Sequence, residues 1–241
     1  MTSEMQAMDP AKRFYQNSFE QLVEEGIANN YADGHAIRQG RHRYSNAFAH
    51  VSANSGKSLM EMGYGGNGII EIFAPFASEY HIIDIVDRTS GQKQPGNVTV
   101  HEANLDNRFP FEDASFDVIL AMMVIEHMYD PFHAFSEVAR VAKSGANIFI
   151  NLPNIGSIRC RLQLLSGRMP VTSGNDWFEK RSWDGSHLHY FTVCDVKRLA
   201  ALYGLEMIEV RPVGRFMALK RLWPELFCHE ITYHFRMSAD S

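Results

Sequence analysis

A glycine-rich turn directly follows a short apolar segment that carries an acidic residue. The segment covers residues 58–62, contains Glu61, and leads into Gly63 and Gly65. Residues 69–77 can continue from the turn as a helix. Glycine tolerates positive φ and has no side chain to block a ligand, so a strand, glycine turn and helix in this order bring backbone close to a nucleotide-like molecule. The same turn also connects strands to helices for purely steric reasons, and both interpretations stay open.

An acidic side chain is predicted at the tip of the next strand. Residues 80–86 form a nearly continuous apolar run, typical of a strand buried on both faces in a parallel sheet. Asp84 lies 21 residues beyond Gly63, where a carboxylate can accept hydrogen bonds from both hydroxyls of a ribose. Asp87 is the competing residue, and Asp84 is preferred because it follows the apolar run directly. A solvated aspartate at a strand end is the structural alternative.

The composition is that of an ordinary globular protein. The chain has 241 residues, of which 21% are charged and 45% apolar, so it can bury a core as one domain. A net charge of −5 gives no electrostatic reason to expect nucleic acid as a partner. Three widely spaced cysteines make neither a disulfide framework nor a zinc pattern. Because no segment approaches the roughly 20 apolar residues that span a bilayer, and the amino terminus lacks a signal-peptide layout, we expect a cytoplasmic protein without membrane insertion.

Strand and helix patterns alternate along most of the chain. Further strands are predicted at 98–101, 116–121, 147–152 and 205–211, and helices at 132–142, 158–166 and 193–203. Short connections between alternating strands and helices indicate a parallel, doubly wound α/β sheet. A final segment, 229–237, has the alternation of an antiparallel closing strand.

Two regions stand outside this alternation. Helical patterns at 11–28 and 35–51 precede the first strand. Residues 1–56 are therefore predicted to form an N-terminal helical cap on a main domain of residues 57–241. The cap is either a lid or simply packs against the main domain. The connection at about 153–190 is long and rich in aromatic residues and histidine, which favours a functional cap insertion over disorder.

Several motifs in order resemble class I S-adenosylmethionine-dependent methyltransferases. The resemblance covers roughly residues 57–211 and rests on the glycine turn, Asp84, the stretch 109–117, the segment 125–131 with Glu126 and His127, and Pro153-Asn154. Residues 162–172 are further similar to the MetW-like branch. The resemblance implies a Rossmann-like sheet of seven strands with the last strand antiparallel.

The resemblance also implies S-adenosyl-L-methionine as the cofactor and assigns residues to it. Gly63 and Gly65 would let backbone approach the methionine part, and Glu61 would set the turn or reach the ammonium group through water. Asp84 would hold the ribose. The remaining contacts would come from Asn104 and Leu105 at the adenine, and from Ala121 and Met122 along the methionine tail.

Two positions depart from the family pattern. The third glycine of the usual spacing falls on Asn67, so the turn can be shaped differently. Some relatives bind a divalent metal through a Glu-x-x-Glu-His set, and the first of these positions is Met123 here. Methionine is a poor ligand for a hard cation, so no metal site is predicted.

Three histidines are candidates for removing a proton from a hydroxyl or amine acceptor. His127 follows the fourth strand, where the methyl group should point, and an ordinary pKa of roughly 6.5 leaves imidazole mostly neutral at pH 7. His187 and His189 alternate in the cap insertion. For each of the three, a purely structural role is the alternative.

The leading interpretation is a methyltransferase that acts on a small polar metabolite, with transfer to oxygen on a sugar or similar hydroxyl. A non-catalytic MetW-like partner, which keeps the cofactor fold but binds and regulates a metabolic enzyme, is the alternative from another class. A nucleic-acid methyltransferase is disfavoured by the net charge. The sequence leaves the oligomeric state open.

Overall fold

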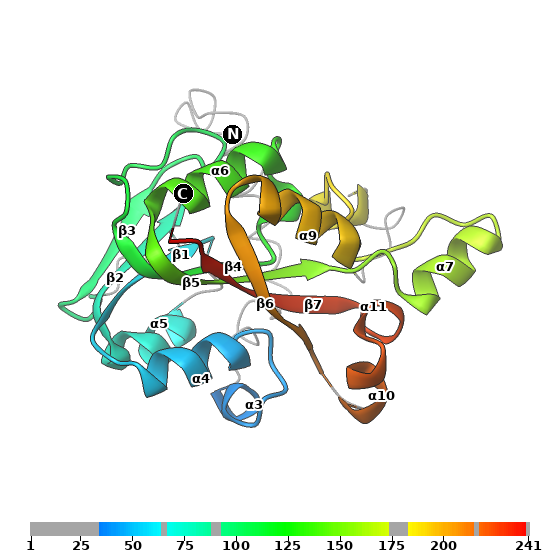
Figure 1. Cartoon of the computed structure of the whole chain (residues 1–241), viewed down its shortest axis with the longest axis horizontal. Helices are drawn as coiled ribbons and strands as arrows, with labels where there is room; N and C mark the ends of the chain where they lie inside the picture. Colours follow the sequence, from blue (N-terminus) through cyan, green and yellow to red (C-terminus); the bar gives the residue numbers. More distant parts are fainter. Residues whose placement is uncertain (1–33, 64–66, 88–92, 174–182, 215–216, 240–241) are drawn as a thin grey trace, which may run out of the picture.

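The computed structural model describes residues 34–63, 67–87, 93–173, 183–214 and 217–239. The predicted helix at 11–28, Gly65 and part of the cap insertion lie outside these ranges. Within them, strands and helices alternate around one central sheet (Figure 1).

The sheet has seven strands in the order β3-β2-β1-β4-β5-β7-β6. Strands β1 to β5 run parallel, and β7 is antiparallel to both of its neighbours. This arrangement confirms the predicted Rossmann-like α/β sheet with an antiparallel last strand. The strands are β1 (Lys57–Met62), β2 (Ala77–Asp84), β3 (Val98–Glu102), β4 (Phe116–Met122), β5 (Ala142–Pro153), β6 (Leu205–Pro212) and β7 (Glu230–Met237).

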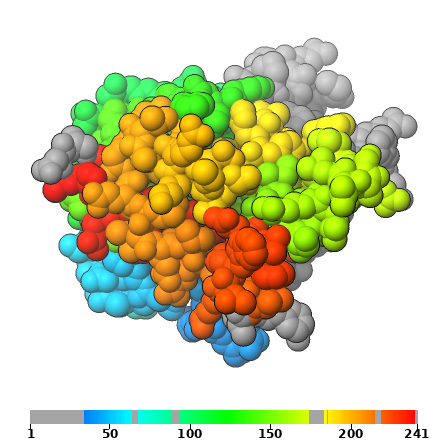
Figure 2. All heavy atoms as spheres, turned by 45° about the vertical axis from the view of Figure 1, so that its right-hand side comes forward, coloured from blue at the N-terminus to red at the C-terminus, as the bar shows by residue number. Residues whose placement is uncertain are grey.

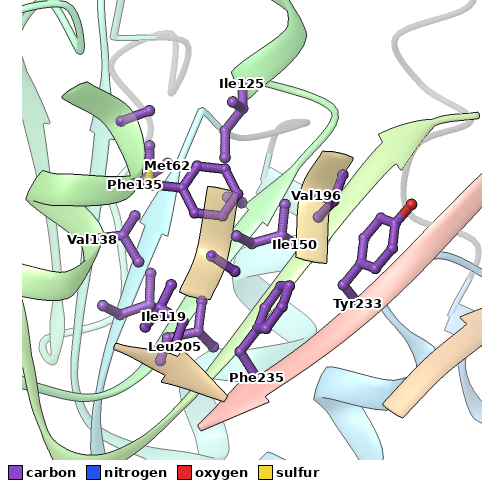
Figure 3. Close-up of a cluster of buried hydrophobic side chains, with 14 of the residues drawn as sticks. Met62, Ile119, Ile125, Phe135, Val138, Ile150, Val196, Leu205, Tyr233 and Phe235 are labelled. Carbon is purple, nitrogen blue, oxygen red and sulfur yellow. The ribbon is translucent and has the colours of Figure 1, made fainter. Parts of the chain in front are cut away.

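Helices cover both faces of the sheet. On one face, α3 (Gly34–Arg38), α4 (Ser45–Ala53) and α5 (Asn67–Phe73) contribute to a core cluster with residues of β1, β2 and β4. On the other, α6 (Pro131–Val141) and α9 (Val193–Leu202) bury apolar side chains against β4, β5 and β7 (Figure 3). Burial on both faces explains why the parallel strands are near-continuous apolar runs rather than alternating ones.

Local capping fixes where two of these helices begin. Asp130 accepts a hydrogen bond from the Phe132 amide, so Asp130 is the N-cap of α6 and Pro131 its first helical residue. Thr192 and Asp195 form a reciprocal capping box at the start of α9.

Several predicted boundaries are wrong. The helix predicted at 35–51 breaks between α3 and α4, where Gly40 has a φ of +76°. The second strand ends at Asp84 and not at residue 86. The fifth strand starts already at Ala142 and not at residue 147, because the chain turns directly from α6 into extended backbone.

The insertion between β5 and α9 projects to one side of the sheet (Figure 1). It contains α7 (Ile158–Leu165) and the 3₁₀ turn η4 (Trp183–Ser186), and a bridge between Asn154 and Phe191 closes its base. On the surface, α7 lies beside the segment with α10 (Met217–Leu222) and α11 (Pro224–Phe227), as Figure 2 shows. Among the helices that the structure describes, none is both long and apolar enough to cross a membrane.

Candidate active site

The carboxyl end of β1 requires glycine at its first loop position. Gly63 has a φ of +56°, and its amide donates to the Ile83 carbonyl oxygen at 2.8 Å. A Cβ at this position would lie 2.8 Å from Cγ2 of Val124, which follows β4. Both the backbone conformation and the close approach therefore exclude a side chain here.

Asp84 is the last residue of β2 and lies next to this turn, because Met62 pairs with Ile83 in the sheet. Its side chain is only 5% exposed, and Oδ1 accepts a hydrogen bond from the Val86 amide at 3.3 Å. Asp87 is exposed and lies beyond the strand. The structure thus puts Asp84, and not its competitor, at the buried strand tip.

Glu61 is fully buried beneath the turn. Its carboxylate accepts hydrogen bonds from the hydroxyl groups of Tyr44 and Tyr80. Burial raises the pKa of Glu61 to about 7, and the two tyrosine hydrogen bonds only partly offset that effect. Tyr44 precedes α4, so this carboxyl group links the N-terminal helices to the first strand. The tyrosines were not predicted, since nothing in their local sequence marks them as partners of Glu61.

The other predicted cofactor residues lie around the same edge. Asn104 follows β3, and its Oδ1 accepts from the Asp106 amide at 2.9 Å. Leu105 belongs to the core cluster. Ala121 and Met122 end β4 and are buried.

The residues at this edge fit a nucleoside-bearing cofactor. The turn at Gly63 has a positive φ and carries no side chain, and Asp84 offers a buried carboxylate on the neighbouring strand. Asn104 and Leu105 would then lie toward the base, while Met122 would lie toward the methionine tail. Gly65, predicted for the same turn, lies outside the described residues.

A third buried carboxyl group lies beyond β4. Glu126, in the 3₁₀ turn η3 (Ile125–His127), is 0% exposed, and neither side-chain oxygen has a hydrogen-bond partner among the described residues. Burial raises the pKa of Glu126 to about 8. Its backbone carbonyl accepts from the amides of Leu188 and His189, which attaches the cap insertion to η3.

Two of the three predicted histidines meet at this carboxyl group. The rings of His127 and His187 lie 4.8 Å apart between centroids, in an edge-to-face arrangement. Glu126, His127 and His187 each offer one potential ligand atom, and these atoms lie within 4.8 Å of one another. His189 is not part of the cluster; its Nε2 donates to the Tyr129 carbonyl oxygen at 3.1 Å.

Asp184 connects two parts of the cap insertion next to His187. It is buried and accepts hydrogen bonds from the amides of Thr172 and Ser173 and from the Thr172 hydroxyl. Burial alone would raise the pKa of Asp184, but these hydrogen bonds outweigh it and lower the pKa. The backbone is strained nearby, with φ of 39° at Asp184 and 72° at Ser186. Sequence reasoning missed Asp184 because its partners lie 11 and 12 residues away in an irregular loop.

Comparison with known proteins agrees with this fold. A methyltransferase from Haloferax volcanii, solved in complex with the Trm112 methyltransferase activator, superposes with a TM-score of 0.62 at 13% identity over 91% of this chain and 97% of that one. The Burkholderia thailandensis 1,6-didemethyltoxoflavin-N1-methyltransferase, solved with S-adenosylhomocysteine, gives a TM-score of 0.57 at 12% identity over 92% and 90%. The fold is therefore that of class I methyltransferases.

A family model described as a methyltransferase domain matches residues 32–210, and the chain belongs to this family. The ubiquinone biosynthesis O-methyltransferase of Hahella chejuensis is 30% identical over 109 residues, which are 43% of this chain and 46% of that protein. The chain thus spans about half the length of the curated relatives it matches.

Proposed function

We propose that this protein is an S-adenosylmethionine-dependent methyltransferase that transfers a methyl group to a hydroxyl oxygen of a small molecule. The observation that carries the proposal is the pairing of two sites at one edge of the sheet. A glycine turn with a buried aspartate lies at the ends of β1 and β2. A cluster of one buried carboxyl group, one buried imidazole and one partly exposed imidazole follows β4, the strand next to β1.

The first site is proposed to hold the cofactor, which supplies an electrophilic methyl group. Asp84 would accept hydrogen bonds from the ribose hydroxyls, and the backbone at Gly63 would contact the methionine part. Asn104 and Leu105 would contact the adenine. Glu61 would act indirectly, because its two tyrosine hydrogen bonds fix the carboxyl group beneath the turn.

The second site is proposed to prepare the acceptor. A hydroxyl group needs to lose its proton as it attacks a methyl carbon, and imidazole is the side chain best suited to take it near pH 7. Among the predicted histidines, His127 is the strongest candidate because it lies in the cluster and follows β4 directly. His187 would assist within the cluster. His189 lies outside it and would position Tyr129 through its hydrogen bond.

Transfer to oxygen is supported by the name of the Hahella relative, an O-methyltransferase. The acceptor class, a sugar or another small polar hydroxyl compound, extends the prediction from the sequence. Methyl transfer by the full chain to a panel of sugars, nucleotide sugars and phenols, followed through formation of S-adenosylhomocysteine, tests it. We expect turnover with at least one hydroxyl acceptor. Turnover confined to amine acceptors or nucleic acid would contradict the proposal.

A further inference from the structure

The carboxyl group of Glu61 is fully buried beneath the cofactor end of the site. It is 0% exposed, belongs to β1 and comes two residues before Gly63. Its hydrogen bonds fix where it lies, but its charge is a separate property. A carboxylate that is removed from water keeps its charge only where its neighbours stabilise it. The charge of Glu61 therefore depends on what surrounds it, including a bound ligand.

The neighbours of Glu61 favour opposite charge states. Burial and the negative charge of Asp84 favour the neutral acid, whereas the hydroxyl groups of Tyr44 and Tyr80, which donate to Oε1 and Oε2, favour the carboxylate. On the β4 side, Leu120 lies opposite Glu61 in the sheet and carries no charge. The result is a pKa of about 7 for Glu61, so both charge states are populated at neutral pH.

The substrate and product forms of the proposed cofactor differ in charge at the sulfur atom. S-adenosyl-L-methionine carries a sulfonium, and loss of its methyl group leaves S-adenosylhomocysteine with a neutral thioether. A cation near a carboxyl group favours the carboxylate, and this attraction is largest where burial lowers the effective dielectric constant. A neutral thioether gives no such preference. The charge of Glu61 is therefore linked to the form of the cofactor that is bound.

We propose that Glu61, held by Tyr44 and Tyr80, makes the cofactor end select S-adenosylmethionine over S-adenosylhomocysteine. The carboxylate is the state that pairs with the sulfonium. When the ligand loses that positive charge, the carboxyl group takes up one proton from the solvent, and the total charge of the site is unchanged. The inference rests on the proposed function, because it takes the ends of β1 and β2 as the place of the cofactor. It adds a physical basis for releasing the product in preference to the substrate.

Tyr44 gives the N-terminal helices a part in this selection. It precedes α4 and is 2% exposed, and its ring lies 5.8 Å from that of Phe73 between centroids. The carbonyl oxygen of the preceding Arg43 accepts a hydrogen bond from the Thr232 hydroxyl of β7 at 3.2 Å. These contacts hold the Tyr44 hydroxyl toward Glu61, so Tyr44 is a positioning residue that acts through the carboxyl group.

Calorimetric titration of the full chain with S-adenosylmethionine and with S-adenosylhomocysteine, in buffers of different ionisation enthalpy, measures affinity and proton exchange together. The preference for S-adenosylmethionine should be full at pH 8, where Glu61 is already ionised. It should fall by about 3- to 10-fold at pH 6, where binding has to release the proton. Glu61→Gln should abolish this pH dependence and the associated proton release. Protons exchanged by the amino group of the ligand are common to both proteins and cancel in the comparison.

Tyr44→Phe separates the positioning role from a purely structural one. It removes a hydrogen bond that stabilises the carboxylate, so the pH at which the preference is lost should move upward. A structural role would lower both affinities without moving that pH. Tyr233→Phe is the matched control, because this buried hydroxyl has no hydrogen-bond partner among the described residues, and it should leave the profile unchanged.

His42 is the other titratable group next to Tyr44. Its ring stacks on that of Tyr44 with the centroids 5.7 Å apart, and imidazole exchanges a proton near neutral pH. His42→Gln should leave the pH dependence of the preference in place. Loss of the pH dependence in His42→Gln, with the pH dependence retained in Glu61→Gln, would assign the proton to the histidine and overturn the inference.

A preference that is independent of pH in the wild-type chain would also overturn it, while binding of both compounds would leave the proposed function standing. Absence of binding of either compound to the wild-type chain would contradict the proposed function itself. If Glu61→Gln binds neither compound because it does not fold, Tyr44→Phe decides, and an unmoved pH profile in that variant overturns the inference.

Discussion

The two halves of the candidate site are built in different ways. At the cofactor end, Gly63 and Asp84 lie at the tips of adjacent parallel strands, and sheet pairing fixes their positions. At the acceptor end, Glu126 and His127 lie in a single 3₁₀ turn, and a loop from far along the chain brings His187 to them. The first half depends on the sheet and the second on how the insertion docks.

The difference extends to how the polar groups are satisfied. At the cofactor end, the buried carboxyl group of Glu61 is bound by two tyrosine hydroxyls. At the acceptor end, the buried carboxyl group of Glu126 has no hydrogen bond to either oxygen within the described part of the chain. A buried polar group that has its hydrogen-bond partners within the protein is part of the structural framework. In an enzyme, a buried polar group without such partners indicates a ligand site. We therefore expect substitutions at the cofactor end to weaken cofactor binding, and substitutions at the acceptor end to slow turnover.

His127→Ala should have the largest effect and should act on turnover alone. Loss of the side chain that removes the proton from the acceptor typically slows the chemical step by about 10²- to 10⁴-fold. S-adenosylhomocysteine affinity should stay within about threefold, because His127 lies outside the cofactor end. Steady-state kinetics and calorimetry on the same preparation measure both quantities, with His133→Ala as the matched histidine control. Wild-type turnover in His127→Ala would show that the cluster is only structural.

Gly63→Ala should damage both stability and cofactor binding. A non-glycine residue at positive φ costs about 1–2 kcal/mol, and the contact with Val124 adds an overpacking cost of about 1–3 kcal/mol. Gly56→Ala is the matched control, since Gly56 has a φ of +80° but no atom within 4 Å of the added Cβ. Urea unfolding should show a loss of about 2–5 kcal/mol in the first variant and about 1–2 kcal/mol in the second. Equal losses, with cofactor affinity intact in both, would contradict the close approach at the turn.

Asp84→Asn should weaken cofactor binding and leave the fold intact. Hydrogen bonds to a charged group are worth about 1.5–3 kcal/mol, so affinity for S-adenosylhomocysteine should fall by about 10- to 100-fold. Asp87→Asn replaces the exposed neighbour and should change the affinity by less than about twofold. Calorimetric titration of both variants distinguishes them, and a larger effect in Asp87→Asn would reverse the assignment made from the sequence.

The smallest expected effect is that of replacing Asp117, which lies at the start of β4, at the opposite end of the strand from the candidate site. Burial alone would raise the pKa of Asp117, but hydrogen bonds from Ser58 and Lys143 outweigh it and lower the pKa to about 2. Because the pKa is lower in the folded state, the stabilisation is present above pH 4 and is lost as the pH falls toward 2. Asp117→Asn should remove about 1 kcal/mol at pH 7, since water screens this partly exposed group, and clearly less at pH 2, where the carboxyl group is about half protonated in the folded state. Urea unfolding at the two pH values measures this, and a pH-independent difference would contradict the assignment.

Much of the fold follows from local patterns in the sequence. The strands appear as apolar runs, and Asp130-Pro131 correctly marks the start of α6. The place of Asp84 at a strand tip was predictable because an apolar run and a spacing from a glycine are both local features. These are properties of a few neighbouring residues, and they do not depend on how the chain closes in space.

The acceptor end depends on contacts that no local pattern encodes. His187 was a candidate from its residue type, but its proximity to His127 follows from the docking of the insertion onto the Glu126 carbonyl. The Thr172-Asp184 hydrogen bonds that orient His187 lie within an irregular loop. The break between α3 and α4 was missed for a similar reason, since apolar residues on both sides keep helical spacing across it.

The central claim is that the ends of β1 and β2 hold a nucleoside-bearing cofactor. Calorimetric titration of the full chain with S-adenosylhomocysteine tests it most directly, because it requires neither the acceptor nor a metal. The account predicts saturable binding of one molecule per chain at micromolar concentrations. A titration without saturable heat, repeated with S-adenosylmethionine and supported by unchanged thermal unfolding in the presence of either compound, would contradict it.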